Sequence, residues 1–469
     1  MKALHKLTAL LLTAAMASTA MPVFAAEDET VDLILANVTL NGDSVSIETL
    51  DNAAGIIADG NKITITASGA YLFSGTLADG QIIVNIPDEV ADPGTVKLFL
   101  NGVDITGVSE APIYIINAEN TSITLLDGTE NVLRDGGKYT ETTAVIYAKD
   151  DITIKGSVGD TAGKLTVNSV YQDGIQCNND IKLTGGNVKV RTNDGDGTTT
   201  GIGDGIRGKT SVTIKDGKLD VNAGGDGVKS TKGTVTISGG DTEIKAGNDA
   251  VQGETALDIS GGRLKANGDR GLRLDNGTIN ITGGDILASA TDYQVNEAAN
   301  NTIINATQVT VLISLTEEQV KDQEVNVTDR ANGTPIMSFT PDKKFSYLLL
   351  SSDKWNYEGN YKMTIAGKEL TGSEEAGTTI TENGLVIEFL NAFLKEPEAA
   401  VYNVDIDCDG EEELEDLVLL AKIIGEDDGI RNYVTADMTA AADVNADDVL
   451  DLRDLRLAMQ IFAGQDVSA

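Results

Sequence analysis

Two acidic segments near the C-terminus have the spacing of a calcium-binding loop. In the first, Asp405, Asp407 and Asp409 occupy the first, third and fifth places, and Asp416 occupies the twelfth. Gly410 follows at the sixth place, where such loops turn sharply. Carboxylate oxygens at this spacing are the ligands that Ca²⁺ prefers. The segment therefore predicts a calcium site.

The second segment repeats the pattern. The oxygen-bearing residues in the same register are Asp443, Asn445, Asp447, Asp451 and Asp454. Each loop leads into an amphipathic stretch, residues 417–424 and 455–462, which predicts a helix. Only a short stretch separates Pro397 from the first loop, too little for the entering helix of an ordinary EF-hand. We therefore expect two loop-helix repeats in an all-α module.

The duplicated motif over residues 403–464 resembles a type I dockerin. The resemblance implies that Glu411 and Val449 add backbone carbonyl ligands to the two calcium sites. It also implies docking onto a cohesin domain of a scaffoldin. The positions that would choose the partner in such a family are Leu414, Glu415, Lys422, Leu452, Arg453, Met459 and Gln460.

A second acidic series recurs in the middle of the chain. Asp173, Asp204, Asp226 and Asp249 each begin a short turn motif that ends in an aliphatic residue. If equivalent positions stack at the strand spacing of about 4.8 Å, these aspartates form a carboxylate column whose repulsion Ca²⁺ would relieve. The alternative is that Asp-Gly is only a favoured turn dipeptide.

Cations follow the same turns. Arg207, Lys229 and Arg273 are candidates for holding an acidic sugar polymer, and Arg270 is the candidate base if the protein is a lyase. The alternative for these side chains is a solvated charged face. Aromatic platforms for flat sugars are sparse, because the tyrosines look scattered and Trp355 is the only tryptophan.

Glycine turns give the fold prediction. Gly217, Gly240, Gly262 and Gly284 lie 22 or 23 residues apart, between short alternating strands. A unit of this length is typical of one coil of a parallel β-helix, whereas a propeller blade needs about 40 residues. We therefore predict an all-β, right-handed parallel β-helix solenoid with β caps, followed by the small all-α module.

Several segments in one order resemble a bacterial family of carbohydrate-binding parallel β-helices with a pectate-lyase-like fold. They are residues 69–75, 98–106, 111–114, 126–131, 147–151 and 204–208. The resemblance implies calcium-dependent binding of plant-cell-wall polysaccharide, either cellulose or acidic pectin, and does not imply catalysis.

Composition narrows the function classes. The net charge of −38 disfavours a nucleic-acid partner. The only histidine, His5, lies in an apparent signal peptide, which excludes Ser-His hydrolases and His-ligated zinc enzymes. Cys177 and Cys408 fall in different predicted domains, so no disulfide is expected. No later segment is apolar enough for a membrane span.

The predicted domains are a signal peptide (1–25), an N-terminal β cap with first coils (26–115), repeats (116–295), a closing β region (296–395), a linker (396–402) and a dockerin (403–466). The favoured function is a secreted, non-catalytic polysaccharide binder, monomeric until it docks. A polysaccharide lyase or hydrolase on the same scaffold is the alternative, and a surface adhesin without a sugar ligand is a third possibility.

Overall fold

The computed structural model describes residues 32–51, 55–136, 141–192, 203–274, 277–292, 302–355, 359–372, 386–395, 404–426, 429–430, 433–445 and 449–463. The chain forms two compact units, Met1–Phe393 and Leu394–Ala469. The predicted signal peptide and linker lie outside the described residues.

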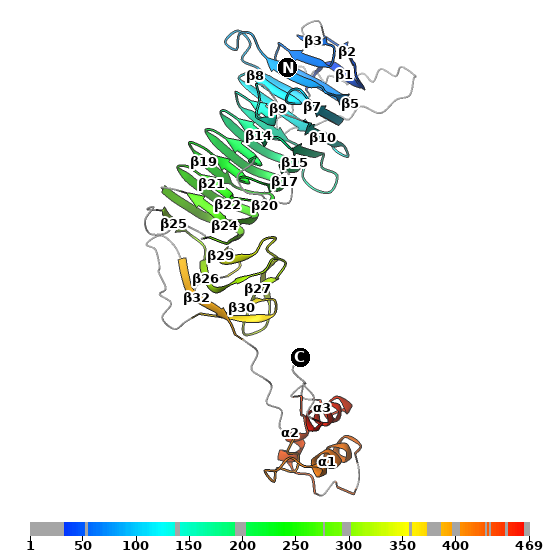
Figure 1. Ribbon diagram of the computed structural model, residues 1–469, viewed down its shortest axis with the longest axis vertical. Coiled ribbons are helices and arrows are strands. Elements are labelled where there is room, and N and C mark those ends of the chain that lie inside the picture. Colours follow the sequence, from blue (N-terminus) through cyan, green and yellow to red (C-terminus); the bar gives the residue numbers. More distant parts are fainter. Residues whose placement is uncertain are drawn as a thin grey trace, which may run out of the picture. The chain divides into compact units, whose positions relative to one another are not determined.

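One face of the N-terminal unit is a sheet that contains ten strands in the described part of the chain (Figure 1). Its neighbours pair in parallel, apart from the antiparallel pair β3–β4. In spatial order the strands are β3 (Ile56–Asp59), β4 (Lys62–Ile65), β6 (Gln81–Asn85), β8 (Ile113–Asn117), β11 (Ala144–Ala148), β14 (Asp173–Cys177), β16 (Ile206–Gly208), β18 (Val228–Ser230), β21 (Asp249–Gly253) and β23 (Arg270–Leu274).

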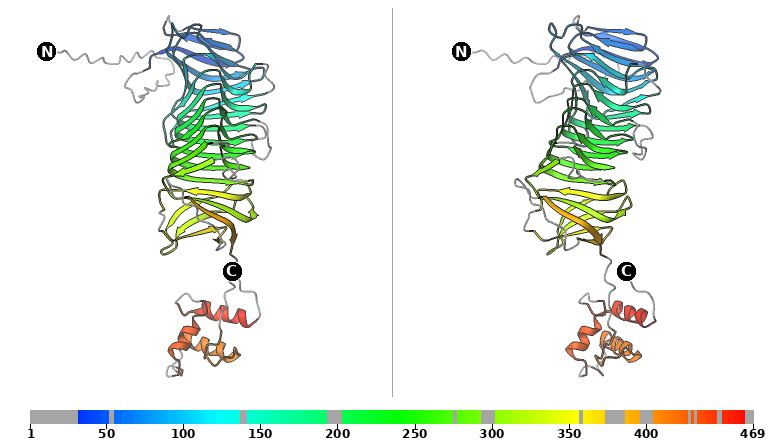
Figure 2. Two further views of the ribbon diagram at one scale, coloured as in Figure 1. Left: turned by 90° about the vertical axis from the view of Figure 1, so that its left-hand side faces the viewer. Right: turned by 60° about the vertical axis from the view of Figure 1, so that its left-hand side comes forward.

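A larger sheet forms the rest of this unit, and Figure 2 shows its strands following one another in succession. Its shorter strands are β1 (Ile34–Gly42), β2 (Val45–Thr49), β9 (Asn120–Leu125), β10 (Glu130–Asp135), β12 (Ile152–Lys155), β13 (Lys164–Ser169), β19 (Thr234–Ile237), β20 (Asp241–Ala246) and β25 (Thr302–Ala306). Its long strands are β5 (Gly69–Ala78), β7 (Thr95–Gly107), β15 (Asp180–Thr192), β17 (Ser211–Ala223), β22 (Ala256–Gly268) and β24 (Gly277–Ala290).

Glycines bend several of the long strands. Gly217, Gly240 and Gly262 all have positive φ, at +91°, +79° and +79°, a region that other residues rarely adopt. They also stack, because a Cβ on Gly240 would lie 2.7 Å from the carbonyl oxygen of Gly217. The glycine pairs expected to separate two strands therefore act as corners, several of them within one continuous strand.

The prediction of a right-handed parallel β-helix solenoid with β caps is wrong. Because a long strand keeps its hydrogen bonding around a corner, it pairs with different neighbours on either side. Parallel pairings consequently join β7, β9, β12, β15, β13 and β10 into a closed ring of six strands beside the ten-stranded sheet. Antiparallel strands also pair directly with this sheet, so the expected separate caps are replaced by continuous hydrogen bonding.

Aliphatic side chains from both sheets form one core. Along the ten-stranded sheet, Ile175, Ile206, Val228, Val251 and Leu272 point inward at successive strands and are buried. The residue after each of them points outward, as the two-residue period of a strand requires. This alternation presents a row of polar and aromatic side chains on the outer face of the sheet.

The last β region continues the larger sheet. Its strands are β26 (Thr310–Gln319), β27 (Val325–Asp329), β28 (Pro335–Phe339), β29 (Phe345–Ser351), β30 (Tyr361–Ile365), β31 (Lys368–Thr371) and β32 (Val386–Leu394). Strand β29 pairs antiparallel with β24 and β26. The buried Lys265 of β22 binds Asp342 in the β28–β29 turn at 2.6 Å, which ties this region to the repeats.

The C-terminal unit has three helices in its described residues: α1 (Leu414–Ile424), α2 (Ala436–Ala442) and α3 (Leu452–Phe462). Helix α2 ends immediately before Asp443, so the second acidic loop has an entering helix. The expectation of two bare loop-helix repeats is therefore wrong for the second half. Val404, Ile406, Leu420 and Ala458 belong to the small core of this unit.

Candidate functional site

The middle aspartates lie one above another at the edge of the ten-stranded sheet. The backbone N–H of Asp204 donates to a carboxylate oxygen of Asp173 at 2.8 Å. The N–H of Asp226 donates to Asp204 at 2.9 Å, and that of Asp249 to Asp226 at 3.1 Å. We call these four residues the aspartate column. Each of the first three carboxylates thus satisfies an amide of the next repeat along the chain.

Cations of this sheet reach the column. Arg207 lies 3.4 Å from Asp173 and 4.0 Å from Asp204, and Lys229 forms an ion pair with Asp226. The repulsion expected between stacked carboxylates is therefore countered by the protein's own charges and amides. Whether Ca²⁺ also binds here stays a prediction.

Of the four carboxylates in the column, that of Asp204 lies farthest from its nearest cation, which is Arg207 at 4.0 Å. Burial, together with the charges of Asp173 and Asp226, raises its pKa to about 7. Burial likewise raises the pKa of Asp173, and burial with the charge of Asp226 raises that of Asp249. Burial opposes the charge of Lys229, yet its acidic neighbours raise the pKa of that ammonium. Asp204 therefore keeps its proton to a higher pH than an ordinary carboxyl group does.

Seven outward side chains follow the strand pairings across the sheet in one line. Each pairs with the next through the observed register. We call this set the outer row; it comprises Tyr114, Tyr147, Gln176, Arg207, Lys229, Gln252 and Arg273. The row contains all three predicted sugar-binding cations, and it adds four residues that the sequence reasoning did not select.

The aromatic end of the row brings together tyrosines that looked scattered in the sequence. The rings of Tyr114 and Tyr147 lie 5.6 Å apart between centroids, tilted by 49°. The ammonium of Lys149 lies 5.4 Å from the Tyr114 centroid, and a hydrogen bond to that tyrosine raises the pKa of the lysine. The 33-residue offset between the two tyrosines matches the pairing of β8 with β11, which is the signal that could have linked them.

Arg270 contacts the buried carboxylate of Asp249. Its Nε and one terminal nitrogen both donate to Asp249, the second at 3.1 Å, and Arg273 donates to the same carboxylate at 2.9 Å. A guanidinium is protonated at any ordinary pH, and a carboxylate partner stabilises that charged form. This geometry favours a structural role for Arg270 over that of a lyase base.

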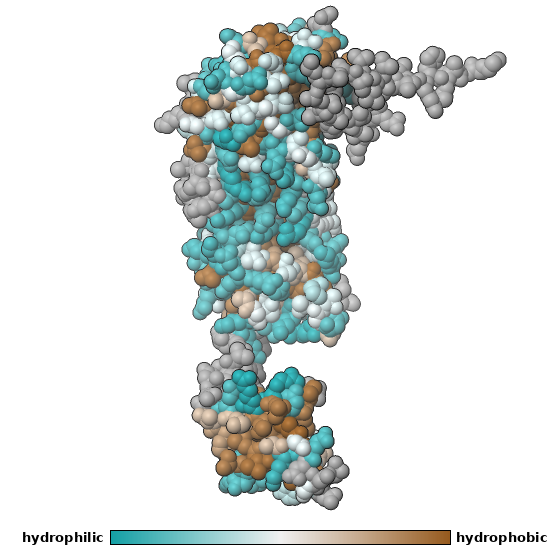
Figure 3. All heavy atoms as spheres, turned by 90° about the vertical axis from the view of Figure 1, so that its right-hand side faces the viewer, coloured by the Kyte–Doolittle hydropathy of each residue, from teal (hydrophilic) through white to brown (hydrophobic). Residues whose placement is uncertain are grey.

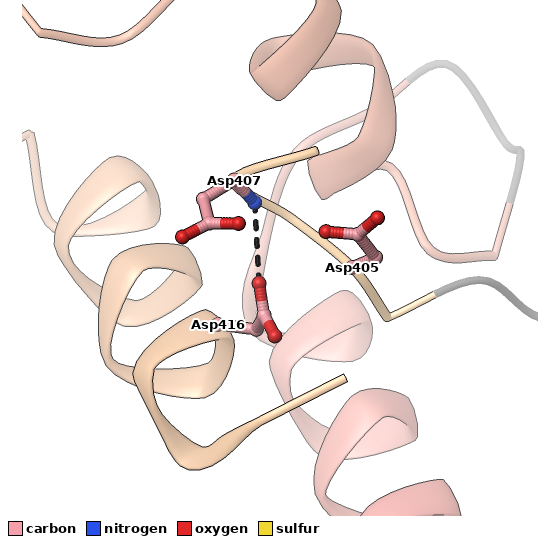
Figure 4. Close-up of side chains that lie close together, drawn as sticks. All are labelled: Asp405, Asp407 and Asp416. Atoms are coloured by element: carbon pink, nitrogen blue, oxygen red, sulfur yellow. Dashed lines mark hydrogen bonds between the residues drawn. The ribbon is translucent and has the colours of Figure 1, made fainter. Parts of the chain in front are cut away.

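The first acidic loop of the C-terminal unit gathers three carboxylates. Ligand oxygens of Asp405, Asp407 and Asp416 all lie within 4.8 Å of one another (Figure 4). Asp416 is buried and accepts N–H groups from Ile406 at 2.8 Å and Asp407 at 3.1 Å. Gly410 has φ +94°, as expected for the turn position.

This arrangement fits Ca²⁺. Partial desolvation and the charges of Asp409, Asp416 and Asp405 raise the pKa of Asp407, which indicates mutual repulsion that a cation would relieve. Carboxylate oxygens in a flexible loop are its usual ligands. Asp409 and Glu411 lie in the same loop and are exposed, with the Glu411 N–H donating to Asp409 at 2.9 Å.

The second loop matches the first where it is described. Asp454 is buried and accepts the N–H of Asn445 at 3.3 Å, and Asp443 and Val449 flank the same loop. Asp447 lies outside the described residues.

The predicted partner-choosing positions fall on exposed parts of α1 and α3. Leu414 is 63% exposed, Leu452 71% and Met459 56%. Glu415, Lys422 and Arg453 are also exposed, and Gln460 is partly buried. Figure 3 shows apolar side chains gathered on one face of this unit. A shallow groove lined by Leu414, Val418, Leu455 and Met459, among other residues, joins α1 to α3.

Residues 59–314 match the family model described as carbohydrate-binding domain-containing protein. The chain belongs to this family. A carbohydrate-binding domain-containing protein of Acetivibrio thermocellus is 42% identical over 163 residues, which make up 33% of this chain and 53% of that protein. The chain thus spans about half the length of this relative.

A solved structure of the polysaccharide lyase-like protein from C. thermocellum, a gadolinium derivative, is 33% identical. It covers 58% of this chain and 100% of its own, with a TM-score of 0.42. The segment that matches the carbohydrate-binding family contains the ten-stranded sheet from β4 to β23 and with it the whole outer row. Among the described residues of this family member, no helix is long and apolar enough to cross a bilayer.

Proposed function

We propose that this protein binds an acidic plant-cell-wall polysaccharide along the outer row. The observation that supports the proposal is the register that lines up two tyrosines, two amides and three cations across seven strands of a domain of the carbohydrate-binding family. Strands lie about 4.8 Å apart, close to the axial length of one sugar unit, so successive sugars meet successive side chains.

The chemistry of the row suits a polymer with carboxylates. Arg207 and Arg273 offer planar donors that match a carboxylate, and Lys229 offers a point charge between them. At the other end Tyr147 is partly exposed and can stack against a sugar face, and Tyr114, only 6% exposed, packs beside it. The aspartate column is nearly buried behind these cations, with Asp249 only 1% exposed at its side chain, so the cations are the part that a ligand meets.

The test is affinity electrophoresis of the full chain through gels that contain polygalacturonate, a soluble cellulose derivative or no polymer, each with calcium and with EGTA. We expect polygalacturonate to retard the protein and Arg207→Gln to weaken that retardation at least fivefold. The matched control is Lys164→Gln, because Lys164 is exposed and ion-paired on the other sheet. Equal retardation of Arg207→Gln and the control would remove the outer row from the binding site.

We further propose that the C-terminal unit binds Ca²⁺ in its two acidic loops and then docks onto a cohesin domain of a scaffoldin outside the cell. The exposed leucines beside the calcium ligands support this proposal, because apolar side chains on so small a unit favour an interface. One cohesin would then hold the polysaccharide-binding unit within a secreted complex.

The docking proposal is tested by calorimetric titration of the chain with a panel of cohesin domains. We expect binding with calcium, none in EGTA, and at least a tenfold loss in Leu414→Lys or Leu452→Lys. Val158→Lys is the control, since Val158 is 58% exposed on the N-terminal unit. The proposal would be contradicted if binding persisted in EGTA, or if Leu414→Lys and Leu452→Lys bound as tightly as the Val158→Lys control.

A further inference from the structure

We propose a second saccharide site, separate from the outer row, in a pocket of ≈ 240 Å³ between the repeats and the last β region. Its residues come from β22, β24, β28 and the segment after β29. Half of this lining, from Ile336 to Lys354, lies beyond the segment that matches the carbohydrate-binding family. The pocket is therefore a feature of this chain's combined domains.

Apolar side chains line much of the pocket. Leu264 and Leu287 of the repeats are buried, and Met337 and Phe339 of β28 are 8% and 7% exposed. A sugar ring presents flat patches of C–H groups, which pack against such surfaces. Small-ligand sites typically combine an apolar lining with a few fixed polar groups.

The polar groups at this pocket are held by ion pairs. Arg263 binds Asp241 at 3.0 Å, and Lys354 binds Asp285 at 2.5 Å. The Ser352 hydroxyl donates to the same Asp285 carboxylate at 2.5 Å. Each pair keeps donors and acceptors in fixed positions, and these suit the adjacent hydroxyls of a sugar.

Deeper in the pocket Lys265 is 9% exposed at its side chain and lies between two carboxylates. Its ammonium binds Glu243 at 2.7 Å and Asp342 at 2.6 Å. Because Arg263, Lys265 and Lys354 all have carboxylate partners, the pocket has no surplus positive charge to select an anion. The geometry thus points to an uncharged saccharide, because the partner carboxylates of these cations are themselves accessible, 30% to 45% exposed at their side chains. The outer-row cations are paired as well, but with carboxylates that are only 1% to 8% exposed, so a ligand there meets the cations.

The size of the pocket limits the ligand. Sites for drug-sized molecules occupy roughly 300–1,000 Å³, and this pocket is smaller. It therefore suits one or two sugar rings, such as the end of a neutral chain or a side branch of the same wall polymer that the outer row would bind.

The test is saturation-transfer NMR and calorimetry of the full chain with cellotetraose, xylotetraose, mannotetraose and tetragalacturonate. We expect at least one neutral oligosaccharide to bind, and the double variant Arg263→Met with Lys354→Met to weaken it at least tenfold. Lys344→Met is the matched control, since Lys344 forms an exposed ion pair with Glu318 away from the pocket. Ser338→Trp, which fills the pocket from an exposed position, is a second variant if the double variant unfolds.

Failure of this site is distinguishable from failure of the outer row. Arg207→Gln should leave neutral binding intact, and the pocket variants should leave retardation by polygalacturonate intact. The inference is overturned if none of the three neutral oligosaccharides binds, if the pocket variants bind them as the wild type does, or if Lys344→Met loses binding equally.

Discussion

Asp416 and Asp454 occupy equivalent places in the two halves of the C-terminal unit. Each is buried in the first turn of its helix and accepts the N–H of the residue three positions before it, from Glu413 at 2.7 Å and from Asp451 at 2.9 Å. The other oxygen of each accepts the N–H of the residue nine positions before it, from Asp407 and Asn445. Each aspartate thus closes its loop even without an ion.

Replacing Asp416 with alanine should destabilise the C-terminal unit. The change leaves the N–H groups of Ile406, Asp407 and Glu413 without this acceptor, which costs roughly 3 kcal/mol. Urea unfolding in saturating Ca²⁺, followed by the helical ellipticity, measures this loss together with any loss of calcium binding. Asp437→Ala is the control, because Asp437 is exposed on α2. Equal midpoints for the two variants would contradict the role of Asp416.

Calcium removal should melt the same three helices. Without a cation the Asp405, Asp407 and Asp416 carboxylates repel one another, and the energy of binding contributes directly to folding. We expect EGTA to reduce the helical ellipticity and added Ca²⁺, but not the same concentration of Mg²⁺, to restore it. A spectrum that EGTA leaves unchanged would show that the loops fold without calcium.

Asp204 should make stability depend on pH in a direction opposite to that of most carboxyl groups. Its pKa is raised from the ordinary 3.8 of an aspartate to about 7 in the folded protein, so the folded state holds the proton more tightly. The stabilisation that protonated Asp204 gives the folded state is complete below the pKa of the unfolded state. It is lost as the pH rises toward 7, and the total loss is at most about 4 kcal/mol.

The test compares Asp204→Asn with wild type by thermal unfolding in EGTA at pH 4 to 8. The variant keeps an oxygen for the Asp226 N–H but never ionises. It should gain melting temperature relative to wild type as pH rises from 4 to 7, and level off above that. A constant difference across the range would show that Asp204 does not titrate there.

The stacked glycines predict a large effect from a single methyl group. Gly240→Ala places a Cβ 2.7 Å from the Gly217 carbonyl oxygen at a positive φ, so it suffers both a clash and backbone strain. Gly333→Ala has a similar φ of +72° but open space, so it isolates the strain of about 1–2 kcal/mol. Denaturant unfolding should show a clearly larger loss for Gly240→Ala, and equal losses would mean that the corner relaxes.

Arg270 should matter for stability and not for bond cleavage. Arg270→Gln weakens the compensation of the Asp249 carboxylate, which Arg273 still pairs at 2.9 Å, so the expected loss is that of a charged hydrogen bond, about 1.5–3 kcal/mol. Lys189→Gln removes an exposed cation as a control. Incubation with polygalacturonate should give no ultraviolet absorbance of an unsaturated uronate for the wild type or either variant. Absorbance that vanishes only in Arg270→Gln would restore the lyase alternative.

The sequence predicted pairwise relationships better than the architecture. The interval between Asp204 and Asp226 correctly indicated that they stack, because repeats of fixed length put equivalent positions side by side. The glycine pairs predicted turns, whereas Gly217 and Gly262 are corners inside continuous strands. Whether a glycine ends a strand or bends it depends on the hydrogen bonds of its neighbours, and one sequence does not contain that information.

In the candidate sites, too, residues close in sequence were predicted better than residues brought together by strand pairing. The clustering of the Asp405, Asp407 and Asp416 carboxylates could be predicted because these residues lie close together in the sequence, and calcium binding there stays a prediction. The cations of the outer row were predicted from the sequence, but its tyrosines were not. Tyr114 and Tyr147 are brought together by the pairing register of β8 with β11, which depends on the strands between them. Helix α2 was missed because Ala436–Ala442 is short and has no clear apolar period.

The aspartate column has a direction. The carboxylates of Asp173, Asp204 and Asp226 each accept the backbone N–H of the aspartate one repeat later in the chain. The last carboxylate, that of Asp249, instead pairs with two arginines. The arginines thus act as a stop at one end of an otherwise extendable array. Duplication of a 22-residue unit during evolution would preserve every bond if the copy were inserted upstream of Asp249. A copy inserted between Asp249 and Arg270 would instead separate the buried Asp249 carboxylate from both arginines, so this boundary is where the array tolerates lengthening least.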